Sequence, residues 1–190
     1  MSRTTAQRDA RKLHAYLKRN GPGSRLILSR VDGELWWSDA YVMLPVDTGM
    51  AVLLDDYNLT AEPMVCHVAH TIKRAGDATT DFQKLIASST VSLKKMLAVE
   101  PVMLNGHTLL ADDGRTIQEL WSADQGRSVT HRFDRNRLDL AGRDGEWRCS
   151  PDNIGRAPAV RYVDGKVTGL LMPLVGAMRA ESLVPEAVAA

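Results

Sequence analysis

Cysteine is scarce in this chain, which has only Cys66 and Cys149, far apart in the sequence. A CxxC redox pair and a thiolate zinc cluster both need closely spaced cysteines, so the sequence excludes both kinds of site. A single disulfide between the two cysteines remains open at this point.

Long apolar stretches are also absent. No uninterrupted apolar run approaches the roughly 20 residues of a membrane-spanning helix, and residues 1–8 lack the apolar centre of a secretory signal. We therefore expect a cytoplasmic protein that has no membrane partner.

The sequence motifs of common enzymes are missing as well. The chain contains no HExxH, no GxSxG and no Walker or Rossmann glycine pattern. His67 and His70 have a spacing that suits two ligands on one helical face, but no carboxylate cluster or cysteine accompanies them. We expect no catalytic residue, no metal and no cofactor, and hence a protein that is not an enzyme. An enzyme site assembled from scattered residues ranks last; its candidates are His67, His70, Asp55 and Asp112.

Neither sign of charge dominates. The chain carries 24 basic and 23 acidic residues, for a formal net charge of +1. No overall field marks it as a nucleic-acid binder, although local patches can still serve that role. Its 190 residues, 44% of them apolar, are enough for one ordinary domain or two small ones.

A hairpin pattern is present twice. Val31-Asp32-Gly33 is followed by the apolar run 41–46, and Val163-Asp164-Gly165 is followed by the apolar run 170–175. An Asp-Gly pair between apolar runs favours a tight β-hairpin turn. The two copies predict either two related units or the same hairpin chemistry arising twice.

Helical periodicity occurs in three segments. Apolar residues with spacings of three and four predict helices over 5–19 and 81–97, the second with Thr79 or Thr80 as its cap, and a shorter helix over 135–141. We expect Asp55 to Asn58 to form a turn.

Runs of strand-forming residues between turn signals predict the strands. The segment 64–72 fits a strand or a short helix, and Asn105-Gly106 predicts a further hairpin. The predicted strands are 25–29, 34–38, 41–46, 50–54, 102–104, 108–111, 116–121, 128–133, 146–149, 159–163 and 167–172.

These elements predict an α+β fold, with antiparallel sheets and helices on one face. We expect two units, 1–98 and 99–177, followed by a loosely ordered tail, 178–190.

Basic residues concentrate on two predicted helices. On the first, the face opposite Ala10, Leu13 and Leu17 is basic, and Asp9 is the only acid in the helix. A surface that only confers solubility usually mixes both signs, so these faces favour contacts with backbone phosphates. The candidate DNA-binding residues are Arg8, Arg11, Lys12, Lys18, Arg19, Lys84 and Lys95.

The second half has an order of elements that resembles a bacterial DNA sliding-clamp subunit. A polar strand precedes the helical segment Phe133 to Ala141, the strand Glu146 to Ser150, and the closing segment Ala157 to Leu174 with its Leu-Met-Pro ending. The resemblance covers about half the chain and is strongest over residues 128–175.

That resemblance implies repeated α+β units that form a ring, with basic helices lining a channel for duplex DNA. It also implies an apolar pocket for partner peptides, formed by Leu170, Leu171, Met172, Pro173 and Leu174. The expected protein is a homo-oligomeric clamp that holds DNA independently of sequence and tethers replication or repair proteins.

An alternative of another class is a non-enzymatic interaction module, or an inhibitor, that acts on a cellular protein. It would use exposed Trp36 and Trp37 together with methionine-rich strands. Neighbouring residues on a regular strand point to opposite faces, so one tryptophan is expected under a helix or in an interface.

Overall fold

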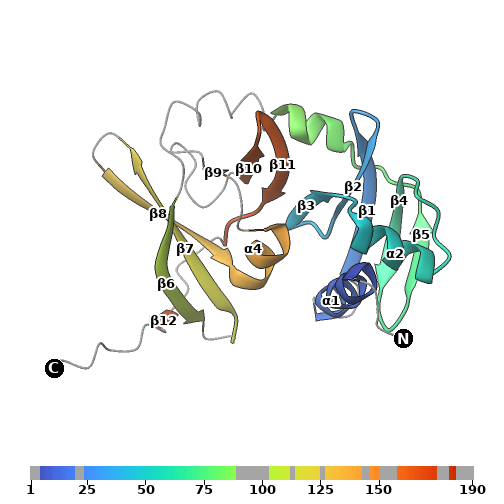
Figure 1. Ribbon diagram of the computed structural model, residues 1–190, viewed down its shortest axis with the longest axis horizontal. Helices are drawn as coiled ribbons and strands as arrows, with labels where there is room; N and C mark the ends of the chain where they lie inside the picture. Colours follow the sequence, from blue (N-terminus) through green and yellow to red (C-terminus); the bar gives the residue numbers. More distant parts are fainter. Residues whose placement is uncertain are drawn as a thin grey trace. The chain divides into compact units, whose positions relative to one another are not determined.

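The computed structural model describes residues 5–19, 24–88, 103–111, 114–124, 127–142, 146–149, 158–174 and 180–182. The chain divides into two compact units, Met1–Ser88 and Ser89–Ala190 (Figure 1). Each combines antiparallel strands with helix, which confirms the predicted α+β class. The clamp-like character of the units stays a prediction. In the part of the chain that is described, no helix is long and apolar enough to cross a membrane.

Unit 1 is built on five antiparallel strands in the order β5-β4-β1-β2-β3. A further helical segment spans residues 82–88. The other elements are α1 (Thr5–Arg19), β1 (Ser24–Val31), β2 (Glu34–Ser38), β3 (Val42–Pro45), α2 (Thr48–Asp56), β4 (Met64–Val68) and β5 (Ile72–Gly76).

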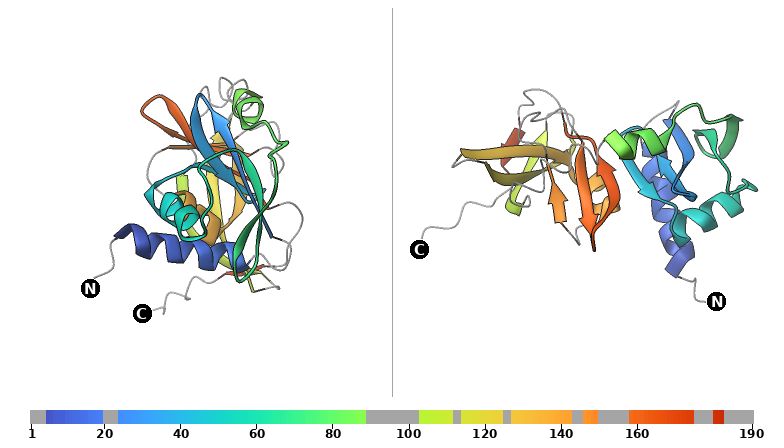
Figure 2. Two further views of the ribbon diagram at one scale, coloured as in Figure 1. Left: turned by 90° about the vertical axis from the view of Figure 1, so that its right-hand side faces the viewer. Right: turned by 90° about the horizontal axis from the view of Figure 1, so that it is seen from above.

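Both faces of strand β2 are covered. Trp36 and Trp37 point to opposite faces, yet they are only 4% and 2% exposed. Figure 2 shows α1 and α2 on one side of the β1–β2 hairpin and the helical segment 82–88 on the other. The exposure expected for the two tryptophans is therefore wrong, because a strand with layers on both sides buries consecutive side chains.

The segment predicted as a strand at 50–54 is a helix instead. Asp47 caps α2 by accepting a hydrogen bond from the Met50 backbone N–H at 2.7 Å. Met50, Leu53 and Leu54 are buried, and their spacing of three and one places them on one helical face. A short apolar run fits either structure, and here the cap decides for helix.

The segment left open at 64–72 is a strand followed by a turn. β4 ends at Val68, and β5 begins at Ile72 and pairs with β4. Asp55 and Asp56, expected in a turn, form the end of α2, and the turn follows at Tyr57 and Asn58.

The two Asp-Gly turns have the same backbone conformation. The φ angles are 48° and 84° at Asp32 and Gly33, and 48° and 80° at Asp164 and Gly165. Two consecutive positive φ angles identify the tight hairpin turn that matches strand twist. The first turn contacts the helical segment 82–88, since the Asp32 N–H donates to Gln83 Oε1 at 2.6 Å.

The helical segment begins where Asp81 caps it. The Asp81 side chain accepts a hydrogen bond from the Lys84 N–H at 3.2 Å, so Asp81 takes the capping role predicted for Thr79 or Thr80. Residues 89–97 of the predicted helix lie outside the described residues.

Unit 2 contains the antiparallel strand orders β12-β6-β7-β8 and β11-β10-β9. Its described core includes Ile117, Phe133, Leu138 and Leu171, all fully buried. The elements are β6 (Met103–Ala111), β7 (Thr116–Asp124), β8 (Arg127–Asp134), α4 (Arg135–Ala141), β9 (Glu146–Arg148), β10 (Ala159–Val163), β11 (Lys166–Leu171) and β12 (Ala180–Ser182).

The hairpin predicted at Asn105-Gly106 is wrong. Both residues lie within the single strand β6, where the pairing register with β7 shifts between Leu104 and Thr108. Glycine inside a strand is typical of a bulge, and such an irregularity keeps the strand direction while a hairpin would reverse it. Within the predicted tail, Ala180–Ser182 pairs with β6.

Candidate nucleic-acid interface

Helix α1 presents five cations on one side. Its opposite side packs into the core through Ala10, Leu13 and Leu17, which are 1%, 5% and 1% exposed. These anchors fix the rotation of the helix and leave every basic residue of the set in solvent. The exposed cations are Arg8, Arg11, Lys12, Lys18 and Arg19.

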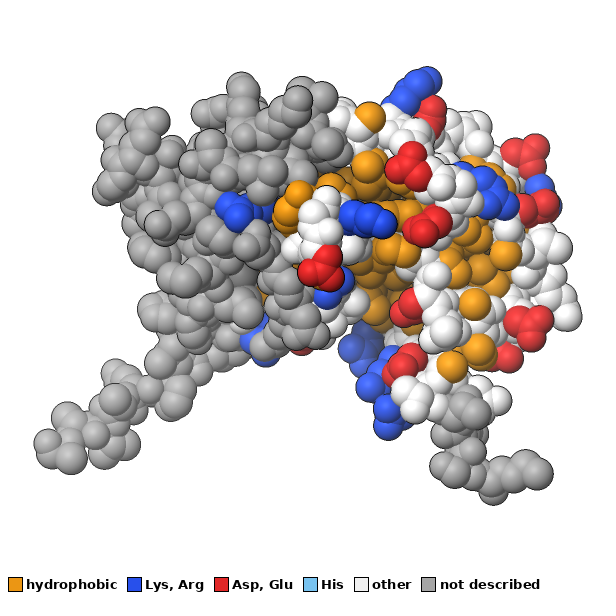
Figure 3. Space-filling model, turned by 45° about the horizontal axis from the view of Figure 1, so that its top comes forward, with side chains coloured by type: hydrophobic (Ala, Val, Ile, Leu, Met, Phe, Trp, Pro, Cys, Tyr) orange, Lys and Arg blue, Asp and Glu red, His pale blue; other side chains and the backbone are white. Residues whose placement is uncertain are grey.

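Few acids neutralise this basic face. Asp9 lies 4.0 Å from Arg8, and both side chains are largely solvated, so the attraction is weak. Lys18 and Arg19 occupy the last turn, where cations favourably face the helix dipole. In Figure 3 a group of Lys and Arg side chains lies at the lower edge of the described surface, with an acidic side chain beside it, and both signs are interspersed elsewhere on the visible described surface.

The structure does not bring Lys84 to this face. Lys84 is exposed on the helical segment 82–88 and lies 3.4 Å from Asp81. That segment is on the other side of the β1–β2 hairpin from α1 (Figure 2). Lys95 lies outside the described residues. The candidate interface is thus the α1 face alone, which we call the basic face.

A groove that the sequence did not predict borders the basic face. It lies between α1 and α2, encloses about 280 Å³ and is lined by Ala10, Arg11, His14, Leu53, Asp56 and Tyr57. The two helices approach closely at the first turn of α2. A Cβ atom added to Gly49 would lie only 3.1 Å from the Cβ atom of Asp9. Sequence patterns give no signal for it, since α2 was predicted as a strand.

His14 of α1 and Tyr57 at the end of α2 contact each other at this groove. The rings meet edge to face with centroids 5.2 Å apart, and the Tyr57 hydroxyl lies 3.2 Å from Nδ1 and 3.3 Å from Nε2 of His14. Burial lowers the pKa of His14, as does the nearby Lys18 charge, while the Ala69 backbone partly offsets both effects. His14 is therefore mainly neutral near pH 7.

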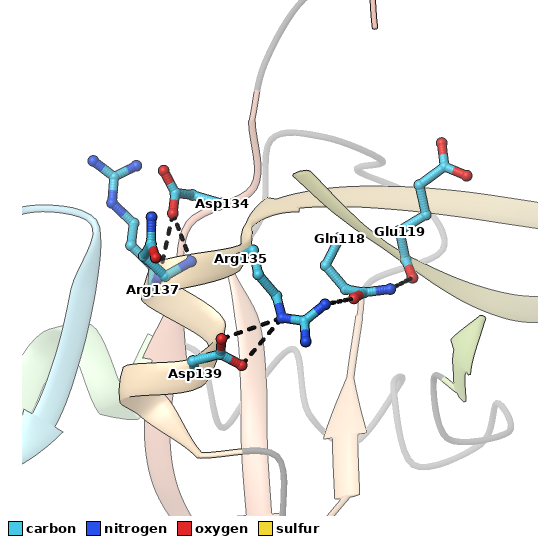
Figure 4. Close-up of polar contacts among 7 residues, drawn as sticks. Gln118, Glu119, Asp134, Arg135, Arg137 and Asp139 are labelled. Carbon is cyan, nitrogen blue, oxygen red and sulfur yellow. Dashed lines mark hydrogen bonds and ion pairs between the residues drawn. The ribbon is translucent and has the colours of Figure 1, made fainter. Parts of the chain in front are cut away.

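The arginines of α4 in unit 2 are engaged by neighbouring side chains (Figure 4). Arg135 Nε donates to both carboxylate oxygens of Asp139 at 3.2 Å, and Nη1 donates to Gln118 Oε1 at 2.8 Å. Arg137 is buried, and Asp134 caps the helix by accepting from the Asn136 and Arg137 backbone N–H groups. The α4 arginines therefore take part in contacts within unit 2, whereas the α1 cations are exposed to solvent.

The residues predicted to bind a partner peptide lie at the end of β11. Leu170, Leu171 and Pro173 are buried, and Met172 is half-buried. The Leu174 N–H donates to the Arg132 carbonyl at 2.8 Å, and its side chain packs against Leu109 and Ile117. These residues belong to the described core of unit 2, and their peptide-binding role stays a prediction.

Three of the four scattered enzyme candidates lie in the described part of the chain. Asp55, His67 and His70 are exposed, and Asp112 lies outside the described residues. Over the residues that are described, no group of three or more His, Cys, Asp or Glu side chains is placed to hold a metal ion.

Both cysteines are free and buried, so the disulfide left open by the sequence is not formed. Burial raises the pKa of Cys66 and raises the pKa of Cys149 to about 12. Since the thiolate is the reactive form, neither cysteine is suited to act as a nucleophile.

No family model, no curated protein and no solved structure matches the chain. Function is therefore inferred from the chain's own residues.

Proposed function

We propose that this protein is a non-enzymatic, sliding-clamp-like protein that associates with duplex DNA and tethers replication or repair partners. The observation that carries the proposal is the basic face, where five exposed cations oppose a buried apolar stripe on one helix. The proposal includes a cytoplasmic location and a homo-oligomeric ring.

The basic face has the length and chemistry for contacts with backbone phosphates. Its 15 residues extend about 22 Å at 1.5 Å per residue. Lysine and arginine pair with phosphates without reading bases, which fits sequence-independent association. If all five cations contact phosphates, the logarithm of affinity should fall with the logarithm of salt concentration with a slope of about −4.5.

Charge reversal on the basic face tests the DNA contact. The triple variant Arg8→Glu, Arg11→Glu, Lys12→Glu should lose most duplex affinity at low salt, measured by fluorescence anisotropy with a labelled duplex. Exposed lysines of β5 and β11 supply the control, because Lys73→Glu and Lys166→Glu reverse charges on elements other than α1. Equal affinity of the triple variant and the control would exclude α1 as the DNA interface.

Retention on closed DNA tests the topological part of the mechanism. A ring slides along duplex DNA, so the protein loaded on a circular plasmid should stay bound through gel filtration and be released when the plasmid is linearised. Light scattering should then report a closed oligomer. A monomer released equally from circular and linear DNA would exclude a clamp and leave a simple DNA-binding protein.

A further inference from the structure

The groove between α1 and α2 is too small for a whole ligand and has the right size for one group of a larger one. Its 280 Å³ lies below the roughly 300–1,000 Å³ of typical small-molecule sites. Arg11 belongs both to the groove and to the basic face. A polymer lying along α1 would therefore pass this opening.

The His14–Tyr57 contact sets which hydrogen-bonding group faces the groove. The Tyr57 hydroxyl lies within 3.3 Å of both ring nitrogens of His14, and in the neutral tautomer in which the nitrogen bonded to it carries no proton, that nitrogen accepts from the hydroxyl. The single hydroxyl proton is then occupied. When His14 is protonated, both ring nitrogens become donors, the Tyr57 oxygen accepts, and its proton is released to donate elsewhere.

We propose that this groove binds one phosphate group of the duplex backbone, with Arg11 as the cation and the Tyr57 hydroxyl as a donor that protonation of His14 makes available. This inference rests on the proposed function. Arginine and a hydroxyl are both common phosphate donors, and a charged acceptor makes each hydrogen bond stronger. The groove thereby couples duplex binding to the protonation of one histidine.

The charges around His14 define the direction of the coupling. On α1, Lys18 disfavours the imidazolium, and Arg11 lines the groove as a cation that favours a phosphate, while on α2 the Asp56 carboxylate lines the same groove and disfavours a phosphate. The turn at residues 69–71 contributes the Ala69 backbone and the exposed His70. A bound phosphate adds negative charge beside the ring, so duplex binding should raise the pKa of His14, and acidification should strengthen binding.

Affinity measured against pH tests the coupling. Duplex anisotropy is recorded for the full chain at constant ionic strength between about pH 7.5 and pH 5.5, the range in which histidine titrates. Wild type should bind more tightly at the lower pH. In Tyr57→Phe and in His14→Gln, the ratio of duplex affinity at the lower pH to that at the higher pH should be about three- to tenfold smaller than in wild type. Tyr57→Phe keeps the ring that packs on His14, so its fold is retained.

Two matched variants sharpen the test. Asp56→Asn removes the carboxylate that repels phosphate and should tighten binding, whereas Asp55→Asn, an exposed neighbour that does not line the groove, should leave affinity unchanged. His67→Gln removes an exposed histidine of β4 and should keep the wild-type pH profile. An unchanged pH profile in both Tyr57→Phe and His14→Gln would overturn the inference while leaving duplex binding intact.

The ring signal of His14 in NMR separates this inference from the proposed function. Its pKa should rise on addition of duplex, and a titration with inorganic phosphate alone shows whether the free ion suffices. A wild-type chain that binds no duplex at low salt at either pH would overturn the proposed function. A chain that binds duplex with no change in the His14 titration would overturn only the groove assignment.

Discussion

The Tyr16 hydroxyl donates a hydrogen bond to Asp39 Oδ2 at 2.6 Å, which ties helix α1 to the turn between β2 and β3. The other carboxylate oxygen of Asp39 accepts from the backbone N–H groups of Tyr41 and Val42 at 2.9 and 2.8 Å. One largely buried carboxylate thus holds both the turn and the helix that carries the basic face.

Removing the two ends of this contact should have unequal effects. Tyr16→Phe loses one hydrogen bond and should lower the free energy of unfolding by about 1 kcal/mol, whereas Asp39→Ala also frees the two N–H groups and should lower it by about 2–3 kcal/mol. Urea unfolding followed by tryptophan fluorescence measures both. The exposed Asp164→Asn is the control and should change little. Equal losses for the two variants would show that Asp39 does not hold the turn.

Replacing Ala40 with glycine should make the folded protein more stable. Its φ of 78° lies in the left-handed region, which costs a residue with a Cβ roughly 1–2 kcal/mol. Ala40→Gly should therefore raise the free energy of unfolding by up to about 1 kcal/mol, after the entropy of glycine in the unfolded chain is subtracted. Ala51→Gly, on the exposed side of α2, should lower stability by about 1 kcal/mol in the same urea assay. A loss in both variants would argue against strain at Ala40.

His131 should make the protein sensitive to acid. The side chain is 4% exposed, and its Nε2 lacks a hydrogen-bond partner, so burial lowers its pKa below the ordinary 6.5. The folded state then favours the neutral ring, whose contribution is fully present above about pH 6.5 and is lost as the pH falls through the folded pKa.

Urea unfolding at several pH values from about 7.5 downward measures this effect. His131→Leu should flatten the fall in stability below about pH 6.5. Adding His14→Gln to this variant should flatten the fall further, because the pKa of His14 is lowered as well. His67→Gln should follow the wild type. A His131→Leu variant whose stability falls as steeply as that of wild type would contradict the assignment.

Local patterns were sufficient where one side of an element is apolar and a turn residue marks its end. The spacing of Ala10, Leu13 and Leu17 predicted α1 with its observed bounds, and the two Asp-Gly pairs predicted turns that share the same left-handed backbone angles. The basic face followed directly from the same spacing, because the residues opposite a buried stripe must lie in solvent.

Local patterns failed where the environment of a segment decides its structure. Residues 50–54 are apolar throughout and fit a strand, but Asp47 caps this segment as a helix. Asn105-Gly106 fits a hairpin turn, but β7 pairs with β6 on both sides of these two residues. The interaction-module hypothesis expected Trp36 and Trp37 to be exposed, but layers on both faces of β2 bury both side chains. In each case the deciding partner is distant in sequence or lies outside the short pattern.

By itself, the sequence determined the α+β class, the hairpin turns and the cations of α1, since these depend on residues a few positions apart. Only the tertiary structure decided that Lys84 lies away from the basic face and that α1 and α2 enclose a groove where Arg11, His14 and Tyr57 meet. Such meetings depend on how separate elements pack, and packing is set by side chains that contact one another across long stretches of chain.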